Sequence, residues 1–578
     1  MASTAALTAG TLSTASASPH PATASASSNA SSAVVAAANA AAHSHAKATG
    51  VGEHDTLKAT EALVDPNGKK HVRFVRTHRG LPVLGADLIV HLDAKNRYLG
   101  VTRATNRTID LAVTTPKKSA AAARTAAAAG KGTAGSAKLV VSALAGHAPV
   151  LAYQVRVTGS ATAEGTGARD VVVDATTGRI LSDTPVGDPF LSPTALDKLR
   201  KQNGTSHAAP TAPRTAARGL LPASAAASGT TATGYSLYDG TVSLNASPYT
   251  YQGSRYYILK DSSRGNTEVR DADNQETQNF DDGYLAASTS TTFGNGSTSD
   301  RNSAAVDAMY GITSTLDFYK STFGRNGIAN DGAGAHGMVH WGNSVGNAFW
   351  DPDCNCMLYG DGDGRDFKKP LVVLDVTGHE LTHGVVGATA DLQPTRTDSR
   401  GNQYGEPGAL NESLADIFGS GVEFATNNAK NPPNYLMGER LGIAQGFLRR
   451  LDQPSQDKLE GTVDYWSKSL TDAEVHGGSG VSSHAFYLLA EGSGRKTIGG
   501  VSYNSPTYDG STVTGIGRAK ALNIFYYALT RYMVSTTSFH GARTATLNAA
   551  KDLYGASSTE YQTVNKAWAA VNVTASNG

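Results

Sequence analysis

The chain has 578 residues, more than one hydrophobic core usually supports, so two or three domains are expected. Lys and Arg total 50 against 49 Asp and Glu, a formal net charge of +1, which gives no global field to attract nucleic acid or an anionic membrane. No apolar run approaches the ~20 residues that a membrane-spanning helix needs. We therefore expect a soluble protein with neither nucleic acid nor a membrane as its partner.

The first fifty residues are rich in Ala, Ser and Thr and contain no aromatic residue. Such a composition predicts that residues 1–50 are disordered. No Lys or Arg precedes Lys47, so the charged start of a secretory signal is missing, although Ala15-Ser16-Ala17 and Ala24-Ser25-Ala26 resemble small-residue cleavage sites. We interpret this segment as a leader whose start is truncated or misassigned, and we expect the protein to be exported.

Residues 51–200 contain short runs rich in Val, Leu and Ile, which predict strands, and an Ala-rich stretch, which predicts an exposed helix. These features indicate a folded region of the α+β class. Residues 201–233 are rich in Pro, Gly, Ser, Thr and Ala, the composition of an exposed linker, so a domain boundary is placed there. The predicted strands are 71–76, 86–92, 150–155 and 170–174, and the predicted helix is 119–137.

The second half of the chain changes character along its length. Strand-like segments and glycine turns continue to about residue 300, and helical patterns dominate from Leu371 onward. Between them an apolar stripe at helical spacing predicts a core helix; its members are Met309, Ile312, Leu316, Tyr319 and Phe323. The predicted fold class is therefore α+β, with a β-rich front over 234–385 and a helical rear over 386–578.

The segment from His379 to His383 reads His-Glu-Leu-Thr-His. On a helix, residues four apart lie on one face about 6 Å apart, so two imidazoles can converge on one metal ion while Glu380 lies beside them. The motif by itself is only moderately specific, because paired surface histidines could also produce it.

A second helix, predicted around 409–419, supports the metal site. Its apolar positions form a stripe that predicts burial, and it carries Glu412 and Asp416 one turn apart. A buried carboxylate needs a partner or a metal, although a solvated face would explain the acids more simply. Glu412 would complete a His, His, Glu set with an open fourth position, which is the arrangement of a catalytic zinc. Asp416 would then hold the far nitrogen of one histidine.

The chain has two cysteines, Cys354 and Cys356, separated by one residue. This spacing could close a small disulfide in an oxidising compartment. A Cys-x-Cys metal site would need further soft ligands, and the chain has no other cysteine, so a structural role is favoured.

The two predicted helices that carry the proposed zinc ligands, together with three further motifs, make the chain resemble the thermolysin-like neutral zinc metallopeptidases. Within that family, bacterial secreted precursors are the most similar in style. The further motifs are Asn347–Trp350, Tyr359–Gly364 and Val475–Gly480. The resemblance implies a two-lobed catalytic unit from about Tyr235 to the C-terminus. It also implies that 51–200 is a propeptide with two small α+β modules, around Thr56–Thr105 and Ala148–Asp183. Such a propeptide assists folding and blocks the cleft until the chain is cut in the linker.

The resemblance implies roles for individual residues. Zinc would be bound by His379, His383 and Glu412, with Glu380 as general base and Asn411 and Asp416 as supporting partners. His476 would stabilise the transition state, Asp472 would orient His476, and Tyr404 would also contact the oxyanion. Structural calcium, expected as one ion, would be bound by Asp375, Glu423 and Glu439, although surface charge is an equally good explanation of Glu439.

The resemblance also implies how a polypeptide substrate binds. An extended peptide would pair with Asn347, Ala348, Phe349 and Trp350 through main-chain hydrogen bonds. Phe367, Val376 and Leu448 would line the pocket for the residue after the scissile bond, and Arg449 would hold that residue's carbonyl. This arrangement predicts a secreted monomeric endopeptidase that cleaves before bulky apolar residues.

Two other functions stay open at this point. Zinc aminopeptidases also combine this motif with a downstream Glu, so an exopeptidase is possible. An inactive secreted binding protein, whose cleft the N-terminal region fills permanently, is the alternative of a different class.

Overall fold

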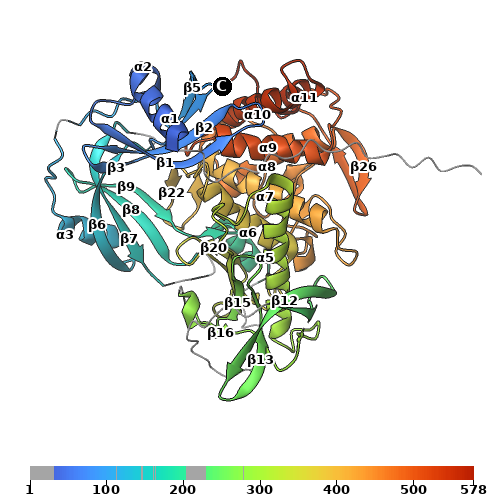
Figure 1. The fold of residues 1–578 in the computed structure, drawn as a ribbon. Helices are drawn as coiled ribbons and strands as arrows, with labels where there is room; N and C mark the ends of the chain where they lie inside the picture. Colours follow the sequence, from blue (N-terminus) through green and yellow to red (C-terminus); the bar gives the residue numbers. More distant parts are fainter. Residues whose placement is uncertain are drawn as a thin grey trace, which may run out of the picture.

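A computed structural model describes residues 32–203 and 229–578, apart from residues 112, 145, 146, 161, 163, 164 and 278. Figure 1 shows an N-terminal region of strands and short helices that lies against the helices at the C-terminal end of the chain. No helix among these residues is long and apolar enough to span a bilayer.

The N-terminal region, residues 32–189, is built on one nine-stranded sheet of order β5-β4-β2-β3-β6-β7-β8-β9, with β1 paired to β2. The two predicted modules are therefore joined through a shared sheet. All four predicted strands are confirmed, in β2, β4, β7 and β8. The strands are β1 Asp55–Val64, β2 Lys70–His78, β3 Leu81–Leu84, β4 Leu88–Leu92, β5 Tyr98–Arg103, β6 Thr133–Ser142, β7 Val150–Thr158, β8 Ala168–Asp174 and β9 Ile180–Pro185.

The prediction that residues 1–50 are disordered is wrong for 32–50, and residues 1–31 lie outside the described part. Helix α1 spans Ser32–Ser44 and α2 spans Ala46–Thr49. Val34, Ala38 and Ala42 recur every four residues and are buried against the sheet. Small side chains on one helix face allow close packing, and Ala has the highest helix propensity, so a segment poor in large apolar residues still folds.

The predicted helix 119–137 is shorter in the structure. Helix α3 spans Ala120–Ala128 and is capped by Ser119, whose side chain accepts a hydrogen bond from the Ala122 amide. Ala129, with a φ of +40°, is the left-handed residue that caps the end of the helix, Gly130 follows with a φ of +77°, and the chain continues as β6.

The C-terminal body, residues 190–203 and 229–578, begins before the predicted linker. After β10 (Asp188–Pro189), helix α4 (Pro193–Asn203) packs on this body, and β11 starts at Thr230, inside the predicted linker 201–233. The apolar residues before and within α4 belong to the large core of the body; they are Phe190, Leu191, Ala195, Leu196 and Leu199. Residues 204–228, which make up most of the linker, lie outside the described residues.

The front of the body holds two sheets. The five-stranded sheet has order β17-β13-β12-β11-β18, and the seven-stranded sheet has order β10-β20-β21-β19-β15-β14, with β16 paired to β15. Helix α5 (Asn302–Phe323) packs on both sheets and buries the predicted apolar stripe, which is confirmed. The strands are β11 Thr230–Tyr235, β12 Thr241–Tyr251, β13 Ser254–Ile258, β14 Lys260–Asp261, β15 Thr267–Asp271, β16 Tyr284–Leu285, β17 Ala287–Ser288, β18 Thr292–Phe293, β19 His336–Val339, β20 Ala348–Asp351 and β21 Cys356–Tyr359.

The rear of the body is helical, which confirms the predicted α+β class. Its helices are α6 Leu374–Gly387, α7 Glu406–Thr426, α8 Val475–Ala490, α9 Arg518–Tyr532, α10 Phe539–Tyr554 and α11 Thr559–Ala570. Three short hairpins connect them, formed by β22 Arg396–Thr397 with β23 Gln403–Tyr404, β24 Leu436–Met437 with β25 Arg449–Arg450, and β26 Gly494–Ile498 with β27 Val501–Ser505. Cys354 and Cys356 form a disulfide next to β21, as the favoured structural role requires.

Polar contacts hold the N-terminal region against α9 and α10. Asp65 accepts hydrogen bonds from the Arg531 guanidinium at 2.9 Å and from the Tyr527 hydroxyl, and Lys69 pairs with Asp552 at 2.9 Å. His71 also bonds Asp65 at 2.9 Å. Asp65, His71 and Asp552 could bring ligand atoms together, but their carboxylates already have cationic partners, so an ion-pair network describes them fully.

Candidate active site

Helices α6 and α7 cross with their backbones in contact. A Cβ on Gly378 would lie 3.0 Å from the Cα of Gly419, and a Cβ on Gly419 would lie 2.9 Å from the Asp375 carbonyl oxygen. Larger residues at either glycine would push the helices apart. This close crossing brings the side chains of α6 within reach of the carboxylates of α7.

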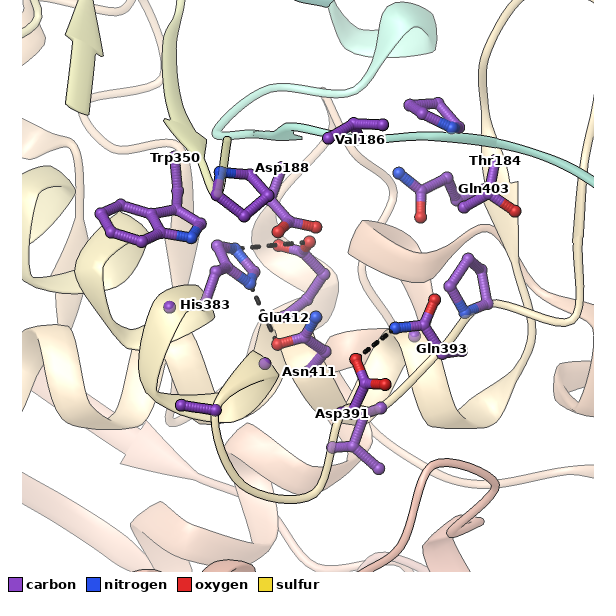
Figure 2. A pocket seen from close by; sticks show the side chains of 18 of the residues that line it. Thr184, Val186, Asp188, Trp350, His383, Asp391, Gln393, Gln403, Asn411 and Glu412 are labelled. Atoms are coloured by element: carbon purple, nitrogen blue, oxygen red, sulfur yellow. Dashed lines mark hydrogen bonds and ion pairs between the residues drawn. The ribbon is translucent and has the colours of Figure 1, made fainter. Parts of the chain in front are cut away.

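His379, His383 and Glu412 converge at this crossing. His383 and Glu412 line a cavity of about 340 Å³. Figure 2 shows these two side chains side by side. The Nε2 atoms of the two histidines lie 3.0 Å apart. The carboxylate of Glu412 is 3.4 Å from Nε2 of His379 and 3.7 Å from Nε2 of His383. The structure thus brings together all three residues that the sequence predicted as ligands.

The opposite ring nitrogens are held by the predicted supporting residues. Asp416 lies 2.8 Å from Nδ1 of His379, and the side-chain oxygen of Asn411 lies 3.0 Å from Nδ1 of His383. Arg449 donates two hydrogen bonds of 2.9 Å to Asp416. With Nδ1 donating to these acceptors, both Nε2 atoms are left unprotonated and free to bind a cation.

The donor set fits zinc. Two imidazole nitrogens and one carboxylate are the ligands of a catalytic zinc with an open fourth position. All three side chains are buried, and Oε2 of Glu412 has no hydrogen-bond partner. A buried carboxylate oxygen beside two unprotonated ring nitrogens is costly unless a cation lies between them, so the residues present match such an ion.

Glu380 lies beside this set on α6. One of its oxygens accepts a hydrogen bond of 2.9 Å from the Trp350 amide, and the other is buried without a hydrogen-bond partner. Burial, then the charges of Glu412 and Asp188, raise the pKa of Glu380 well above its usual value. A carboxylate with one unbonded oxygen and a raised pKa is suited to accept a proton.

His476, at the start of α8, joins the set as predicted. Its Nε2 is 3.5 Å from Glu412. Burial would lower the pKa of His476, but Glu412, Glu474 and Glu460 raise it well above its usual value, so this ring is suited to donate a hydrogen bond.

The prediction that Asp472 orients His476 is wrong. Glu474 lies 2.8 Å from Nδ1 of His476, while Asp472 pairs with Arg396 at 2.8 Å on the exposed surface. Asp472 is the last residue of a short 3₁₀ helix, Lys468–Asp472. Glu474 also caps α8 by accepting from the Gly477 amide. Glu is not among the residue types usually preferred at a helix N-cap, so the sequence carried no signal for this role.

The prediction for Tyr404 is also wrong. Its hydroxyl donates to Asp398 at 3.1 Å and its ring packs on Arg396. The neighbouring Gln403 lines the cavity instead. Successive side chains of a strand point to opposite faces, so a shift of one residue on β23 exchanges the residue that faces the cavity.

The predicted substrate strand is occupied by the chain itself. Strand β10 pairs antiparallel with β20, so that Asp188 lies opposite Trp350 and Pro189 opposite Phe349. The Phe190 amide donates to the Ala348 carbonyl at 3.0 Å. Figure 2 shows the Asp188 side chain beside Glu412 and His383.

The polar groups of the predicted cleft bind the same segment. Asn347 accepts from the Leu191 amide at 3.0 Å and donates to the Leu191 carbonyl at 3.1 Å. Arg449 donates to the Phe190 carbonyl at 3.0 Å. The predictions for Asn347, Ala348 and Arg449 as groups that hold an extended peptide therefore agree with contacts made inside this chain.

The three predicted pocket residues are buried in the same core as Phe190, namely Phe367, Val376 and Leu448. Gly438 lies next to both Phe190 and Leu448, since a Cβ built on it would be 3.5 Å and 3.4 Å from them. Phe367 lines a small cavity with Leu196 and Leu199 of α4.

The predicted calcium ligands Asp375, Glu423 and Glu439 lie close enough for their charges to interact. Burial and then Glu439 raise the pKa of Asp375 to about 8, and burial followed by Glu439 and Asp375 raises that of Glu423 well above its usual value. One oxygen each of Glu423, Glu439 and Asp239 is buried without a hydrogen-bond partner. Asp239, whose pKa burial raises to about 6, was not predicted and has no sequence signal.

Comparisons with known proteins agree with this geometry. The thermolysin metallopeptidase catalytic domain matches residues 231–387, its alpha-helical domain matches 402–573, and the fungalysin/thermolysin propeptide motif matches 55–105.

Individual relatives match most of the chain. The transglutaminase-activating metalloprotease of Streptomyces mobaraensis is 39% identical over 535 residues, which are 91% of this chain and 62% of that protein. The chain thus spans less than two thirds of the length of that relative. Thermolysin of Bacillus sp. (strain EA1) is 33% identical over 88% of this chain and 84% of that protein. A solved precursor of protealysin from Serratia proteamaculans is 28% identical, with a TM-score of 0.40, and covers 53% of this chain and 87% of that chain. On the extent of the match to thermolysin, this chain belongs to the thermolysin family of metallopeptidases.

Proposed function

We propose that this chain is the exported precursor of a zinc-dependent neutral endopeptidase that hydrolyses polypeptides before bulky apolar residues. The observation that carries the proposal is the convergence of His379, His383 and Glu412, together with a buried Glu412 oxygen that has no hydrogen-bond partner. His379 and His383 would bind the ion through Nε2 and Glu412 through its carboxylate, held by Asp416 and Asn411.

Zinc, Glu380 and His476 would have different roles in hydrolysis. Zinc, when bound, would supply a Lewis acid that activates water and polarises the peptide carbonyl. Glu380 would take the proton from the attacking water and deliver it to the leaving amine. His476, oriented by Glu474, would donate a hydrogen bond to the developing oxyanion.

The preference for apolar residues rests on the place of Phe190. Its side chain is fully buried in the core that contains Val376 and Leu448, and its carbonyl is held by Arg449. A substrate residue in that place would bury its side chain in the same apolar surroundings, where a charged side chain would be costly.

The N-terminal region would act as a prosegment that inhibits the enzyme and assists its folding. The segment 188–191, where this region joins the body, occupies the groups that a polypeptide substrate would need. We further propose one structural calcium bound by Asp375, Glu423 and Glu439, with Asp239 close by, and a monomeric mature enzyme.

Hydrolysis of casein with blocked N-termini tests the proposal. The processed protein is expected to cut it, to contain one zinc per chain and to lose activity with phenanthroline, whereas Glu380→Gln should keep zinc but not activity. Release of single residues from free N-termini only would indicate an exopeptidase. Absence of any hydrolysis after removal of the chain up to residue 228 would favour an inactive binding protein.

A further inference from the structure

The peptide bond between Pro189 and Phe190 lies in the place where a substrate bond would react. The segment pairs with β20 as an added antiparallel strand, which is how extended peptides bind to the edge of a sheet. Without β10, β20 would be the edge of this sheet.

The polar contacts on the two sides of this bond differ in kind. The Pro189 carbonyl oxygen, before the bond, lies 3.0 Å from Nε2 of His476, the group proposed to stabilise an oxyanion. The Phe190 carbonyl, after the bond, accepts from Arg449 at 3.0 Å. These two contacts define the register of the segment in the cleft.

The side chain after the bond is of the class that the site is proposed to prefer. Phe190 has no exposed surface, meets the ring of His379 edge to face at 5.2 Å between centroids, and lies under the Arg449 guanidinium. An apolar aromatic side chain is therefore enclosed directly after the bond.

The hydrophobic cores of the protein divide at the same bond. Buried apolar residues from Val34 to Ala175 form clusters that contain only residues of the N-terminal region. Phe190 and the residues that follow it belong to the core of the C-terminal body. A cut between Pro189 and Phe190 would consequently divide no hydrophobic cluster.

We infer that the chain hydrolyses its own Pro189–Phe190 bond as the first step of maturation, ahead of any cut in the linker. This inference rests on the proposed function. The cut that the resemblance implies within 201–233 would then be a later step.

The step consumes one water. The water oxygen bonds to the Pro189 carbonyl carbon, and the bond from that carbon to the Phe190 nitrogen breaks. Glu380 takes one proton from the water and passes it to the Phe190 nitrogen. The second proton moves from the new carboxyl group to the same nitrogen, so the products are a Pro189 carboxylate and a Phe190 ammonium group. The new Pro189 carboxylate then lies next to Asp188, and repulsion between these two carboxylates favours departure of the N-terminal region.

The experiment uses the full-length chain, purified with a chelator and started by adding zinc. Intact mass and N-terminal sequencing are followed over time at two protein concentrations that differ tenfold. A first new N-terminus at Phe190, formed at a rate independent of concentration, is expected, with no such product in Glu380→Gln.

Substitutions at Phe190 test the register. Phe190→Glu should slow the cut at this bond by about a hundredfold or more, since a charge would enter an apolar enclosure, whereas Phe190→Leu should stay within a few-fold of the original rate. An unchanged rate in Phe190→Glu would overturn the inference. Circular dichroism and casein hydrolysis after trypsin trimming check that each variant is folded.

The outcomes separate this inference from the proposed function. If the first cut falls elsewhere and Pro189–Phe190 stays intact while casein hydrolysis develops, the inference fails and the endopeptidase stands. If trypsin-trimmed, zinc-loaded protein hydrolyses no casein, the proposed function fails and the inference fails with it.

Discussion

Glu474 holds His476 through a 2.8 Å contact to Nδ1, and the same carboxylate caps helix α8 by accepting from the Gly477 amide. The ring is thereby fixed with Nε2 directed at the Pro189 carbonyl, 3.0 Å away. One glutamate thus connects the start of a helix to the orientation of a group in the cleft.

This contact predicts a ranked set of losses. His476→Ala should lower kcat by roughly a hundred- to a thousand-fold, the usual effect of deleting one oxyanion donor. Glu474→Gln should lower kcat less, because the ring remains but loses its charged partner. Asp472→Asn is the matched control and should leave kcat unchanged, since Asp472 contacts Arg396. Equal losses in Asp472→Asn and Glu474→Gln would refute the assignment. Steady-state kinetics on a blocked peptide measure all three.

The orientation of β23 predicts different effects for two neighbouring residues. Tyr404→Phe should leave kcat unchanged, because its hydroxyl bonds Asp398 and not the cleft. Gln403→Ala should lower kcat or raise KM, because Gln403 lines the cavity. The reverse pattern in steady-state kinetics would place Tyr404 at the oxyanion after all.

Removal of the carboxylate behind His379 should weaken metal binding. Asp416→Asn is expected to lower zinc affinity about 10- to 100-fold, the usual cost of losing such an outer partner. It also leaves the buried Arg449 guanidinium without its charged partner, so the melting temperature should fall as well. Competition with a chromogenic chelator measures the affinity, with Asp398→Asn, a change at a carboxylate outside the cleft, as control. An unchanged affinity would show that Asp416 does not support the ligand.

Calcium should stabilise the mature enzyme. Buried oxygens of Glu423, Glu439 and Asp239 have no hydrogen-bond partner, and the charges of Glu439, Asp375 and Asp239 add to burial in raising the pKa of Glu423, so a divalent cation would relieve this repulsion and raise the melting temperature. Glu423→Gln should abolish that increase, while Asp509→Asn, at an exposed carboxylate, should keep it. Thermal melts with and without EGTA measure both, and an increase that persists in Glu423→Gln would argue for a different site.

The affinity of the N-terminal region for the C-terminal body should decrease as pH rises through about 6. Asp391 keeps exposed surface in the cavity that it lines, but desolvation there and then Asp87 raise its pKa to about 6, with Asp188 adding to the rise and Arg73 and Gln393 opposing it. A carboxyl whose pKa is raised in the complex stabilises that complex below its free pKa, and the stabilisation is lost as pH increases through the raised value.

For each unit by which binding of the N-terminal region raises the pKa of Asp391, the affinity is expected to fall about tenfold. Affinity of residues 32–189, added in trans to the mature enzyme, should be measured from pH 5 to 8 for the original protein and for Asp391→Asn. The difference between the two isolates this residue from the histidines of the interface, including His71. Parallel curves would exclude Asp391 as the cause.

The sequence by itself determined the parts of the site that depend on local geometry. A helix places residues four apart on one face, so the spacing of His379 and His383, and of Glu412 and Asp416, decides which side chains point together as soon as the helices form. Four strands of the N-terminal region, β2, β4, β7 and β8, and the apolar stripe of α5 were predicted for the same reason, because each period needs only its own segment.

Only the tertiary structure decided the rest. Whether Asp472 or Glu474 reaches His476, whether Gln403 or Tyr404 faces the cavity, and which segment lies in the cleft all depend on how a loop or short strand is held by residues far away in the sequence. Local periodicity carries no information about such long-range contacts. The Pro189–Phe190 bond reaches His476 only because β20, α7 and α8 pack around it, and that packing comes from burial of the whole core and not from the residues next to the bond.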